Sequence, residues 1–293
     1  MTRRHRTVFE KAMQRALFLC ALVSVLSVLF ISVFIFAQGI PVFKDVKIAD
    51  FLFGTLWQPT STVDQRFEVF SFIIGSFFVT GAAVAIGVPI GIAGGIFLAE
   101  IASNPLARVL RPMVELLAGI PSVVYGFFGA VFISRTIRDV FGGTGYSVLA
   151  AAVILAIMIL PTIITITEAS LRGVPHEYRE ASLAVGATRA QTITRTLLPA
   201  ARAGIFAGVV LALGRAIGET TAVLMVGGNA PIMPTGMLSK VRTLTMNVIT
   251  DMGYASGLHL TALFATGMVL FVIVMAINAA VMLLARRTLL RQS

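Results

Sequence analysis

Residues 175–199 read PHEYREASLAVGATRAQTITRTLLP, a polar and strongly patterned stretch between two long apolar runs. Pro175 suits the first turn of a helix, and Glu177 would lie near the positive end of that helix. Gly186 is the residue type that commonly follows a helix, because glycine adopts the left-handed conformation without strain. The first half of the stretch therefore predicts a short helix that stops at Gly186.

The second half of the stretch carries a helix start signal. Thr188 and Gln191 have the T-x-x-Q spacing of a capping box, in which each side chain bonds the backbone of the other residue. Pro199 is expected to interrupt the helix that begins there, because proline lacks a backbone donor. Together the two halves predict a helix-turn-helix elbow and not a slack loop.

Small side chains at Ala181, Ser182 and Ala184 leave the first helix of the elbow with little bulk. Another protein could approach its backbone closely, which suits a docking element. A short helix lying on the membrane surface would explain the same residues. The residues alone leave both interpretations open.

The chain that surrounds the elbow is strongly apolar. Over 293 residues it is 57% hydrophobic and 12% charged, with a mean hydropathy of +0.94, which indicates lipid and not water as its solvent. A helix needs about 20 apolar residues to cross a bilayer. We therefore predict an all-α integral membrane protein with six transmembrane helices. Runs of sufficient length lie at 16–37, 69–98, 113–133, 147–170, 203–226 and 258–285.

Prolines and glycines inside these runs have distinct expected effects. Pro89, Pro121 and Pro161 should kink their helices without ending them, because neighbouring helices can satisfy the freed carbonyls. Glycines four residues apart let two helix backbones approach closely, so ordinary helix packing is their expected role. Such glycines are Gly87, Gly91 and Gly95 in the second run, and Gly204 with Gly208 and Gly214 with Gly218 in the fifth.

The distribution of basic residues predicts the orientation. Six spans put both ends of the chain on one side, and cytoplasmic loops carry an excess of lysine and arginine. If the N-terminus is cytoplasmic, that side holds 15 of the 23 basic residues, the other side holds seven, and Arg215 lies inside a span. We expect both termini in the cytoplasm and the protein in the cytoplasmic, or inner, membrane.

The predicted organisation has four parts. A basic cytoplasmic N-terminus at 1–15 precedes an apolar run too long for a signal-peptide core, so the first helix is expected to be uncleaved. That helix and an external loop occupy 16–67, a membrane core occupies 68–286, and a cytoplasmic tail occupies 287–293. The outer loop, residues 39–67, contains Trp57 and mixed charges that suit folding against the outer face.

The sequence lacks the residues that several classes of function require. The three histidines are far apart and Cys20 is alone, so we predict no metal site, no cofactor and no disulfide framework. Basic residues flank apolar runs and form no stripe, which argues against nucleic acid. No phosphate-binding G-x-x-x-x-G-K-[ST] loop and no hydrolase motif occurs, so we expect a non-enzyme that takes any ATP energy from a separate subunit.

The elbow resembles the EAA signature of ABC importer permeases, whose pattern is E-A-A, three residues, G, nine residues, I, one residue, L-P. The spacing of the elbow matches throughout, with departures at Ser182 and Thr196, where that family usually has alanine and isoleucine. The resemblance implies a type-1 permease fold and a cytoplasmic coupling helix that fits a groove on an ATPase subunit. It implies coupling roles for Glu180, Ala181, Gly186, Leu198 and Pro199.

Two further strings narrow the resemblance. Residues 214–229 read GRAIGETTAVLMVGGN and residues 115–129 read ELLAGIPSVVYGFFG, and both look like the C-type permease of the phosphate-specific (Pst) system. The resemblance implies transport of inorganic phosphate, a homologous A-type permease, cytoplasmic ATPase subunits and an extracytoplasmic phosphate-binding protein. Within the same family, sulfate or molybdate permeases are the nearest alternatives.

Physical chemistry predicts a transport role for Arg215. Placed about 12 residues from either end of the fifth run, it could not reach water by snorkelling, and a charge at that depth costs at least about 2.5 to 3.5 kcal/mol. Glu219, four residues on, is the expected partner. The guanidinium fork matches phosphate oxygens, so we predict a transient anion site that Glu219 neutralises when empty. A purely structural ion pair is the alternative.

Hydroxyl groups near Arg215 are further candidates for the substrate pathway. They could donate to phosphate oxygens, although serine and threonine more often bond to backbone carbonyls of their own helix. The predicted pathway hydroxyls are those of Ser122, Tyr125, Thr220 and Thr221.

Two other classes of protein compete with the permease interpretation. A self-contained secondary transporter or channel would also explain six spans and a buried arginine, but it would leave the elbow without a purpose. A membrane-embedded enzyme is weaker still, since the catalytic residues are missing. Whether uptake needs an added ATPase and internal ATP discriminates the first two classes.

Overall fold

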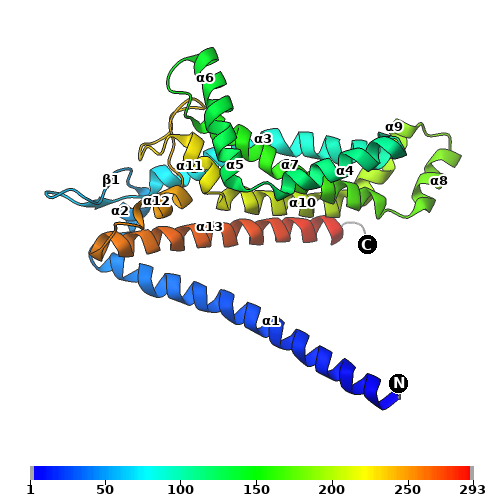
Figure 1. Ribbon diagram of the computed structural model, residues 1–293, viewed down its shortest axis with the longest axis horizontal. Helices are drawn as coiled ribbons and strands as arrows, with labels where there is room; N and C mark the ends of the chain where they lie inside the picture. The colour runs from blue at the N-terminus through cyan, green and yellow to red at the C-terminus, as the bar shows by residue number, and fades with distance from the viewer. Residues whose placement is uncertain (1–2, 291–293) are drawn as a thin grey trace.

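The computed structural model describes residues 3–290, with side chains described for 13–280 and for Leu283. The side chains of the basic stretch up to residue 12, and most of those in the predicted tail, lie outside this description. Long helices run along one axis, and α1 leans away from them (Figure 1). The elements are α1 (Arg3–Gly39), the 3₁₀ turn η1 (Ile40–Lys44), α2 (Ile48–Phe53), β1 (Trp57–Gln58), β2 (Arg66–Phe67), α3 (Phe70–Ile96), the π turn η2 (Phe97–Ile101), α4 (Asn104–Gly119), α5 (Ser122–Phe128), the π turn η3 (Gly129–Ile133), α6 (Ser134–Phe141), α7 (Val148–Arg172), α8 (His176–Ala184), α9 (Arg189–Thr192), the π turn η4 (Ile193–Leu197), α10 (Leu198–Gly218), α11 (Thr221–Gly227), α12 (Leu244–Asp251) and α13 (Gly257–Leu290).

Six membrane-crossing segments agree with the predicted six runs. Within residues 3–290, five helical stretches are long and apolar enough to span a membrane, and a strongly bent pair gives a sixth when it is counted as one span. The predicted all-α class is therefore confirmed, and the described strands form only a two-stranded hairpin in the outer loop. The single stretches are Met13–Lys44, Phe70–Ile101, Val148–Arg172, Arg189–Gly218 and Gly257–Ala280, and the bent pair is Asn104–Gly119 with Ser122–Phe141.

The centre of the bundle is α7, against which α3 and α10 pack on glycine contacts. A Cβ on Gly95 would lie 2.5 Å from Thr167 Cβ, so the helix backbones meet almost directly. On α10, a Cβ on Gly208 would lie 2.8 Å from Ile166 Cγ2. The predicted packing role of the four-residue glycine spacing is thus confirmed for α3 and for the first half of α10.

The third predicted span is broken, and the expectation that Pro121 only kinks it is wrong. Helix α4 ends at Gly119, and the two parts of the span meet at an angle of 95°. Ile120 has the extended conformation (φ −67°, ψ 128°) that a residue before proline favours, because the proline ring clashes with a helical neighbour. Pro121 then serves as the N-cap of α5, which makes it a helix boundary.

The fifth predicted span is also broken. Helix α10 ends at Gly218, Glu219 is extended (φ −70°, ψ 128°), and the short helix α11 begins at Thr221. Arg215 therefore lies in the last turn of α10 and not in the middle of a continuous helix. The side-chain hydroxyl of Thr245, just inside α12, donates to the Glu219 carbonyl oxygen at 3.2 Å and helps to hold the break.

The outer loop is docked on the bundle through a buried polar junction. Trp57 Nε1 donates to Asp251 Oδ2 at 2.9 Å, and His259 Nε2 lies 3.4 Å from the same oxygen. Arg242 Nη1 lies 3.4 Å from the other oxygen, Asp251 Oδ1, and donates to Asn247 Oδ1 at 3.0 Å. All five residues are buried. The junction therefore fixes β1 to the segment that carries α12.

Aromatic rings surround this junction. The guanidinium carbon of Arg242 is 5.9 Å from the Phe72 ring centroid, and the Tyr254 ring is 5.8 Å from the imidazole of His259. Partial burial raises the pKa of the Tyr254 phenol, and the neighbouring Asp251 carboxylate raises it further. The outer loop thus folds against the end of the bundle, as Trp57 indicated in the sequence.

Among the described side chains, helix α1 packs against α13 toward the C-terminal end of α1. A Cβ on Gly39 would lie 2.9 Å from the backbone nitrogen of Ala265, which places α1 directly against α13 there. Phe34 packs edge-on against Phe264, with ring centroids 5.7 Å apart. Beyond these contacts the two helices diverge toward the N-terminus of α1 (Figure 1).

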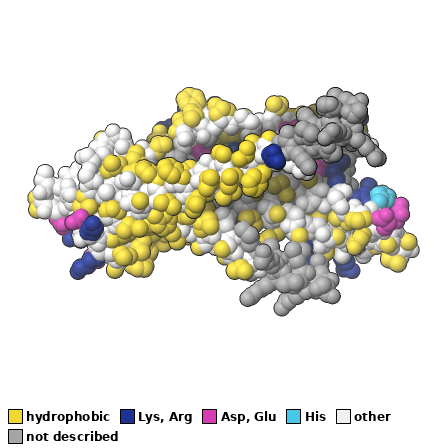
Figure 2. All heavy atoms as spheres, turned by 90° about the horizontal axis from the view of Figure 1, so that it is seen from below, with side chains coloured by type: hydrophobic (Ala, Val, Ile, Leu, Met, Phe, Trp, Pro, Cys, Tyr) yellow, Lys and Arg dark blue, Asp and Glu magenta, His cyan; other side chains and the backbone are white. Residues whose placement is uncertain are grey.

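Figure 2 shows apolar side chains covering most of the visible face, with charged side chains gathered mainly toward its two ends. This distribution suits a chain whose long axis crosses a bilayer, because charged groups favour the aqueous boundaries. One end carries the outer loop, and the opposite end carries α8 (Figure 1).

Candidate functional site

Helix α8 is an exposed element at one end of the molecule. It contains no buried residue, and Glu180 and Ala181 are both exposed. Gly186 follows it with φ +85°, the left-handed conformation that was expected to end this helix, and donates to the Leu183 carbonyl at 2.9 Å. The part of the elbow predicted to dock on another protein is therefore ordered and accessible.

The second half of the elbow follows the prediction at its start and departs from it at its end. Thr188 and Gln191 form the capping box. The Thr188 backbone nitrogen donates to Gln191 Oε1 at 2.9 Å, and the Gln191 backbone nitrogen donates to Thr188 Oγ1 at 3.3 Å. Pro199, however, does not interrupt the helix, since 189–218 is one continuous stretch. The π turn η4 precedes the proline, and the wider turn accommodates the ring.

Contacts that sequence reasoning missed attach α8 to the bundle. Arg179 Nη2 lies 2.5 Å from Glu100 Oε1 in η2, and Ser182 Oγ lies 3.0 Å from Thr192 Oγ1. Thr196 Oγ1 in turn donates to Ser182 Oγ at 3.3 Å. In the sequence, Glu100 is visible only as an acidic residue at the end of an apolar run. Nothing there identifies Arg179, 79 residues further along the chain, as its partner.

A second missed contact lies near the same end of the bundle. The Glu168 carboxylate on α7 accepts from Arg111 on α4 at 2.6 Å and lies 3.0 Å from Arg172 Nε. The Glu168 side chain is only 10% exposed, so two guanidinium groups compensate its burial. This cluster fixes the start of the broken span to the central helix.

The structure brings the predicted pathway residues together at the two helix breaks. Short helices α5 and α11 pack against each other, and a Cβ on Gly126 would lie 3.0 Å from Ala222 Cα. Arg215 lies in the last turn of α10, next to the second break. The grouped residues are Ser122 and Tyr125 from α5, Arg215 from α10, and Glu219, Thr220 and Thr221 from the second break.

The expected ion pair between Arg215 and Glu219 is not present between these two described side chains. Glu219 Oε1 instead accepts from the Ala222 backbone nitrogen at 3.0 Å and so caps α11. The reason is the break, because α10 ends at Gly218 and the extended Glu219 leaves the helix face that carries Arg215. Glu219 therefore has a structural bond that its position in an apolar run did not reveal.

Two of the predicted hydroxyls bond to backbone carbonyls. Tyr125 Oη donates to the Leu117 carbonyl oxygen at 2.8 Å, across the bend between α4 and α5. Thr220 Oγ1 donates to the Gly218 carbonyl oxygen at 3.3 Å. Both bonds satisfy carbonyls at the ends of broken helices, where the helical partner is missing.

The C-terminal end of α10 presents an open face. Arg215 is exposed, and a Cβ on Gly214 or Gly218 would have no neighbour within 4 Å. The expectation that this glycine pair packs a helix is therefore not met within the described chain. A charged side chain between two glycines is thus accessible beside the two breaks.

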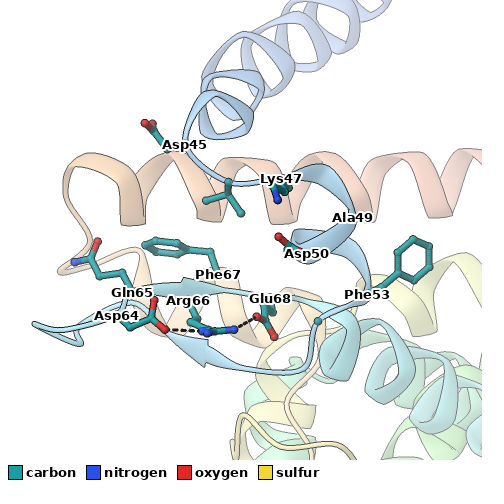
Figure 3. Close-up of a pocket in the computed structure, with 12 residues that line it drawn as sticks. Asp45, Lys47, Ala49, Asp50, Phe53, Asp64, Gln65, Arg66, Phe67 and Glu68 are labelled. Atoms are coloured by element: carbon teal, nitrogen blue, oxygen red, sulfur yellow. Dashed lines mark hydrogen bonds and ion pairs between the residues drawn. The ribbon is translucent and has the colours of Figure 1, made fainter.

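A separate pocket lies between α2 and the β-hairpin of the outer loop (Figure 3). Its volume is about 670 Å³. Arg66 in this pocket bridges Asp64 and Glu68, at 2.9 and 3.4 Å. Carboxylates outnumber cations among the lining residues, which are Asp45, Lys47, Asp50, Asp64, Arg66 and Glu68 with apolar neighbours. This surplus of negative charge does not suit a phosphate site.

Solved structures of ABC importers share this architecture. The chain superposes with a TM-score of 0.59 on a bacterial ABC transporter involved in the import of the acidic polysaccharide alginate, at 17% identity, covering 96% of this chain and 99% of that one. It superposes with a TM-score of 0.57 on the MetNI methionine ABC transporter, at 23% identity, covering 75% and 94%. The fold is the type-1 permease fold that the elbow signature implied.

Sequence comparison gives relatives over most of the chain. It is 39% identical to probable ABC transporter permease protein YqgH of Bacillus subtilis, covering 92% of this chain and 89% of that protein. It is 37% identical to phosphate transport system permease protein PstC of Mesorhizobium japonicum, covering 82% and 78%. Residues 91–290 match the binding-protein-dependent transport system inner membrane component. The chain therefore belongs to that family, is a multi-pass membrane protein, and is an ABC importer permease.

Proposed function

We propose that this permease moves inorganic phosphate across the cytoplasmic membrane, driven by separate ATPase subunits and fed by an extracytoplasmic phosphate-binding protein. The observation that carries the proposal is the position of Arg215, a guanidinium exposed where two broken spans meet. The similarity to PstC over 82% of the chain supports phosphate as the anion.

The two breaks suit an aqueous path. Non-helical backbone within a membrane is tolerated only where protein buries it or where it lines a water-filled cavity. The exposed Arg215 side chain lies in such a region with Gly214 and Gly218 beside it, and it forms no ion pair with a described carboxylate. It can therefore receive phosphate oxygens bidentately, and its exposure to water keeps that contact weak enough to release.

Glu219 has a different role from the one first expected. Because its carboxylate caps α11, it holds the second break in place and does not neutralise Arg215. Ser122 and Thr221, in the first turns of α5 and α11, remain as hydroxyl donors to the passing anion. Tyr125 stabilises the first break and Thr220 the second, through their bonds to backbone carbonyls.

The remaining surfaces fit the partners of such an importer. In the proposed arrangement α8 and both termini are cytoplasmic, and α8 enters a groove of the ATPase through the region of Glu180 and Ala181. Leu198 and Pro199 continue the coupling loop into α10. The open end of α10 faces a homologous A-type permease across the path, and the outer loop faces the binding protein.

Replacing Arg215 with glutamine should reduce phosphate uptake by roughly 10- to 100-fold, because a hydrogen bond to a charged group contributes about 1.5 to 3 kcal/mol. Arg215→Lys should retain an intermediate rate, since lysine keeps the charge but not the planar fork. The measurement is uptake of labelled phosphate by liposomes that contain the complete importer, with internal ATP.

The matched control is Arg135→Gln, which removes an exposed arginine of α6 whose ion pair is with Asp139 of the same helix. Normal uptake by a correctly assembled Arg215→Gln importer would contradict the proposed site. Competition by sulfate or molybdate at the same concentration as phosphate would indicate another oxyanion. Uptake that follows an ion gradient without ATP would favour a secondary transporter.

A further inference from the structure

Polar side chains attach α8 to the bundle. No residue of α8 is buried, so this helix contributes no side chain to the hydrophobic core. Two side chains on α8 make the connection. Arg179 reaches Glu100, whose side chain is only 4% exposed, and Ser182 reaches Thr192 and Thr196.

One bond of each connection ends on a π-helical turn. Glu100 belongs to η2, which continues α3, and Thr196 belongs to η4, which leads into α10. A π turn contains an extra residue per turn and often marks a functional position in a helix. The two spans that pack on α7 therefore each have an irregular turn at the end where α8 is attached.

The Ser182 contact also explains the two departures from the EAA pattern. Ser182 stands where the pattern has alanine and Thr196 stands where it has isoleucine, and their hydroxyls bond to each other at 3.3 Å. Alanine and isoleucine could meet at this place only through an apolar contact. The two departures are thus matched, one compensating the other across 14 residues of chain.

We propose that Arg179–Glu100 and Ser182–Thr196 are two tethers through which α8 moves α3 and α10. This inference rests on the proposed function, since the movement originates in an ATPase bound to α8. The four residues are positioning residues. They touch neither phosphate nor nucleotide, and they convert displacement of α8 into displacement of the two turns.

The first test measures coupling in the complete importer. ATP hydrolysis and phosphate uptake are measured on the same liposomes, and their ratio is compared between variants. Glu100→Gln and Arg179→Gln should each lower uptake at least about fivefold while hydrolysis stays within twofold of the unmodified importer. Arg195→Gln, an exposed arginine in the same turn as Thr196, is the control and should leave the ratio unchanged.

The hydroxyl tether is tested by a double-mutant cycle. Thr196→Ile alone should lower the ratio of uptake to hydrolysis, because isoleucine leaves Ser182 without this bond. The double change Ser182→Ala with Thr196→Ile should restore the ratio to within about twofold through apolar contact. Thr194→Ala is the control, because that hydroxyl bonds only to the Ala190 carbonyl of its own helix.

A second measurement separates the tethers from the proposed function. In the purified chain, hydrogen exchange of residues 176–184 should speed up at least about tenfold in Glu100→Gln and not in Arg195→Gln. Unchanged exchange, or uptake and hydrolysis that fall together, would overturn the tethers even if the unmodified importer moves phosphate with ATP. Uptake without ATP would instead overturn the proposed function, while faster exchange in Glu100→Gln would still be seen.

Discussion

Gly95→Val should prevent α3 from packing on α7 and should lower the stability of the permease by about 3 kcal/mol or more. A Cβ at this position would lie 2.5 Å from Thr167 Cβ and 2.9 Å from the Ile164 carbonyl oxygen. The second of these atoms belongs to the backbone, so a rotamer change cannot relieve the clash. The two helices would have to separate at the C-terminal end of their contact.

The measurement is thermal unfolding of the purified permease in detergent, with recovery of monodisperse protein as a second readout. Gly81→Val is the matched control, because Gly81 lies on the same helix and a Cβ there has no neighbour within 4 Å. Both changes carry the same cost in helix propensity. Equal midpoints for the two variants would show that the close approach of α3 and α7 does not support the fold.

Asp251→Ala should release the outer loop and destabilise its end of the bundle by about 3 to 5 kcal/mol, the cost of leaving one partner of a buried ion pair alone. The Asp251 side chain is 2% exposed, forms an ion pair with Arg242 and accepts a hydrogen bond from Trp57. Alanine would leave a buried guanidinium without its carboxylate and the indole nitrogen without an acceptor.

Trp57 reports this change directly, because it is the single tryptophan of the chain. We expect its fluorescence emission to shift to longer wavelength in Asp251→Ala as the ring becomes hydrated, and protease cleavage between β1 and β2 to accelerate. Asp139→Ala is the control, since the Asp139 carboxylate is 60% exposed and its ion pairs are at the surface. Unchanged emission in Asp251→Ala would show that the loop is held by other contacts.

Features encoded by neighbouring residues could be predicted from the sequence. The capping box of Thr188 and Gln191 and the left-handed turn at Gly186 involve groups only a few residues apart, so spacing and residue type are sufficient. The apolar runs likewise predicted the membrane-crossing segments, because lipid contact imposes a length and a composition.

The helix breaks could not be predicted from hydropathy. The apolar run continues through Pro121 and through Glu219, while the backbone turns at both places. A break in one span is stabilised by other segments, as in the bond from Thr245 to the Glu219 carbonyl. Reading 203–226 as one helix placed Arg215 too deep and gave it a partner on a helix face that does not exist.

Contacts between distant parts of the chain were equally hidden. Trp57 and Asp251 are 194 residues apart, and Arg179 and Glu100 are 79 apart. A single sequence carries no signal that joins such pairs. The charges of Glu100 and Asp251 were visible, but their partners depend on how the segments pack.

The divergence of α1 from α13 gives the molecule a tapered outline in the bilayer. The two helices touch at the end that bears Gly39 and separate toward the end that bears α8 (Figure 1). With its long axis across a bilayer, the chain would have a larger cross-section in the leaflet on the α8 side than in the other leaflet.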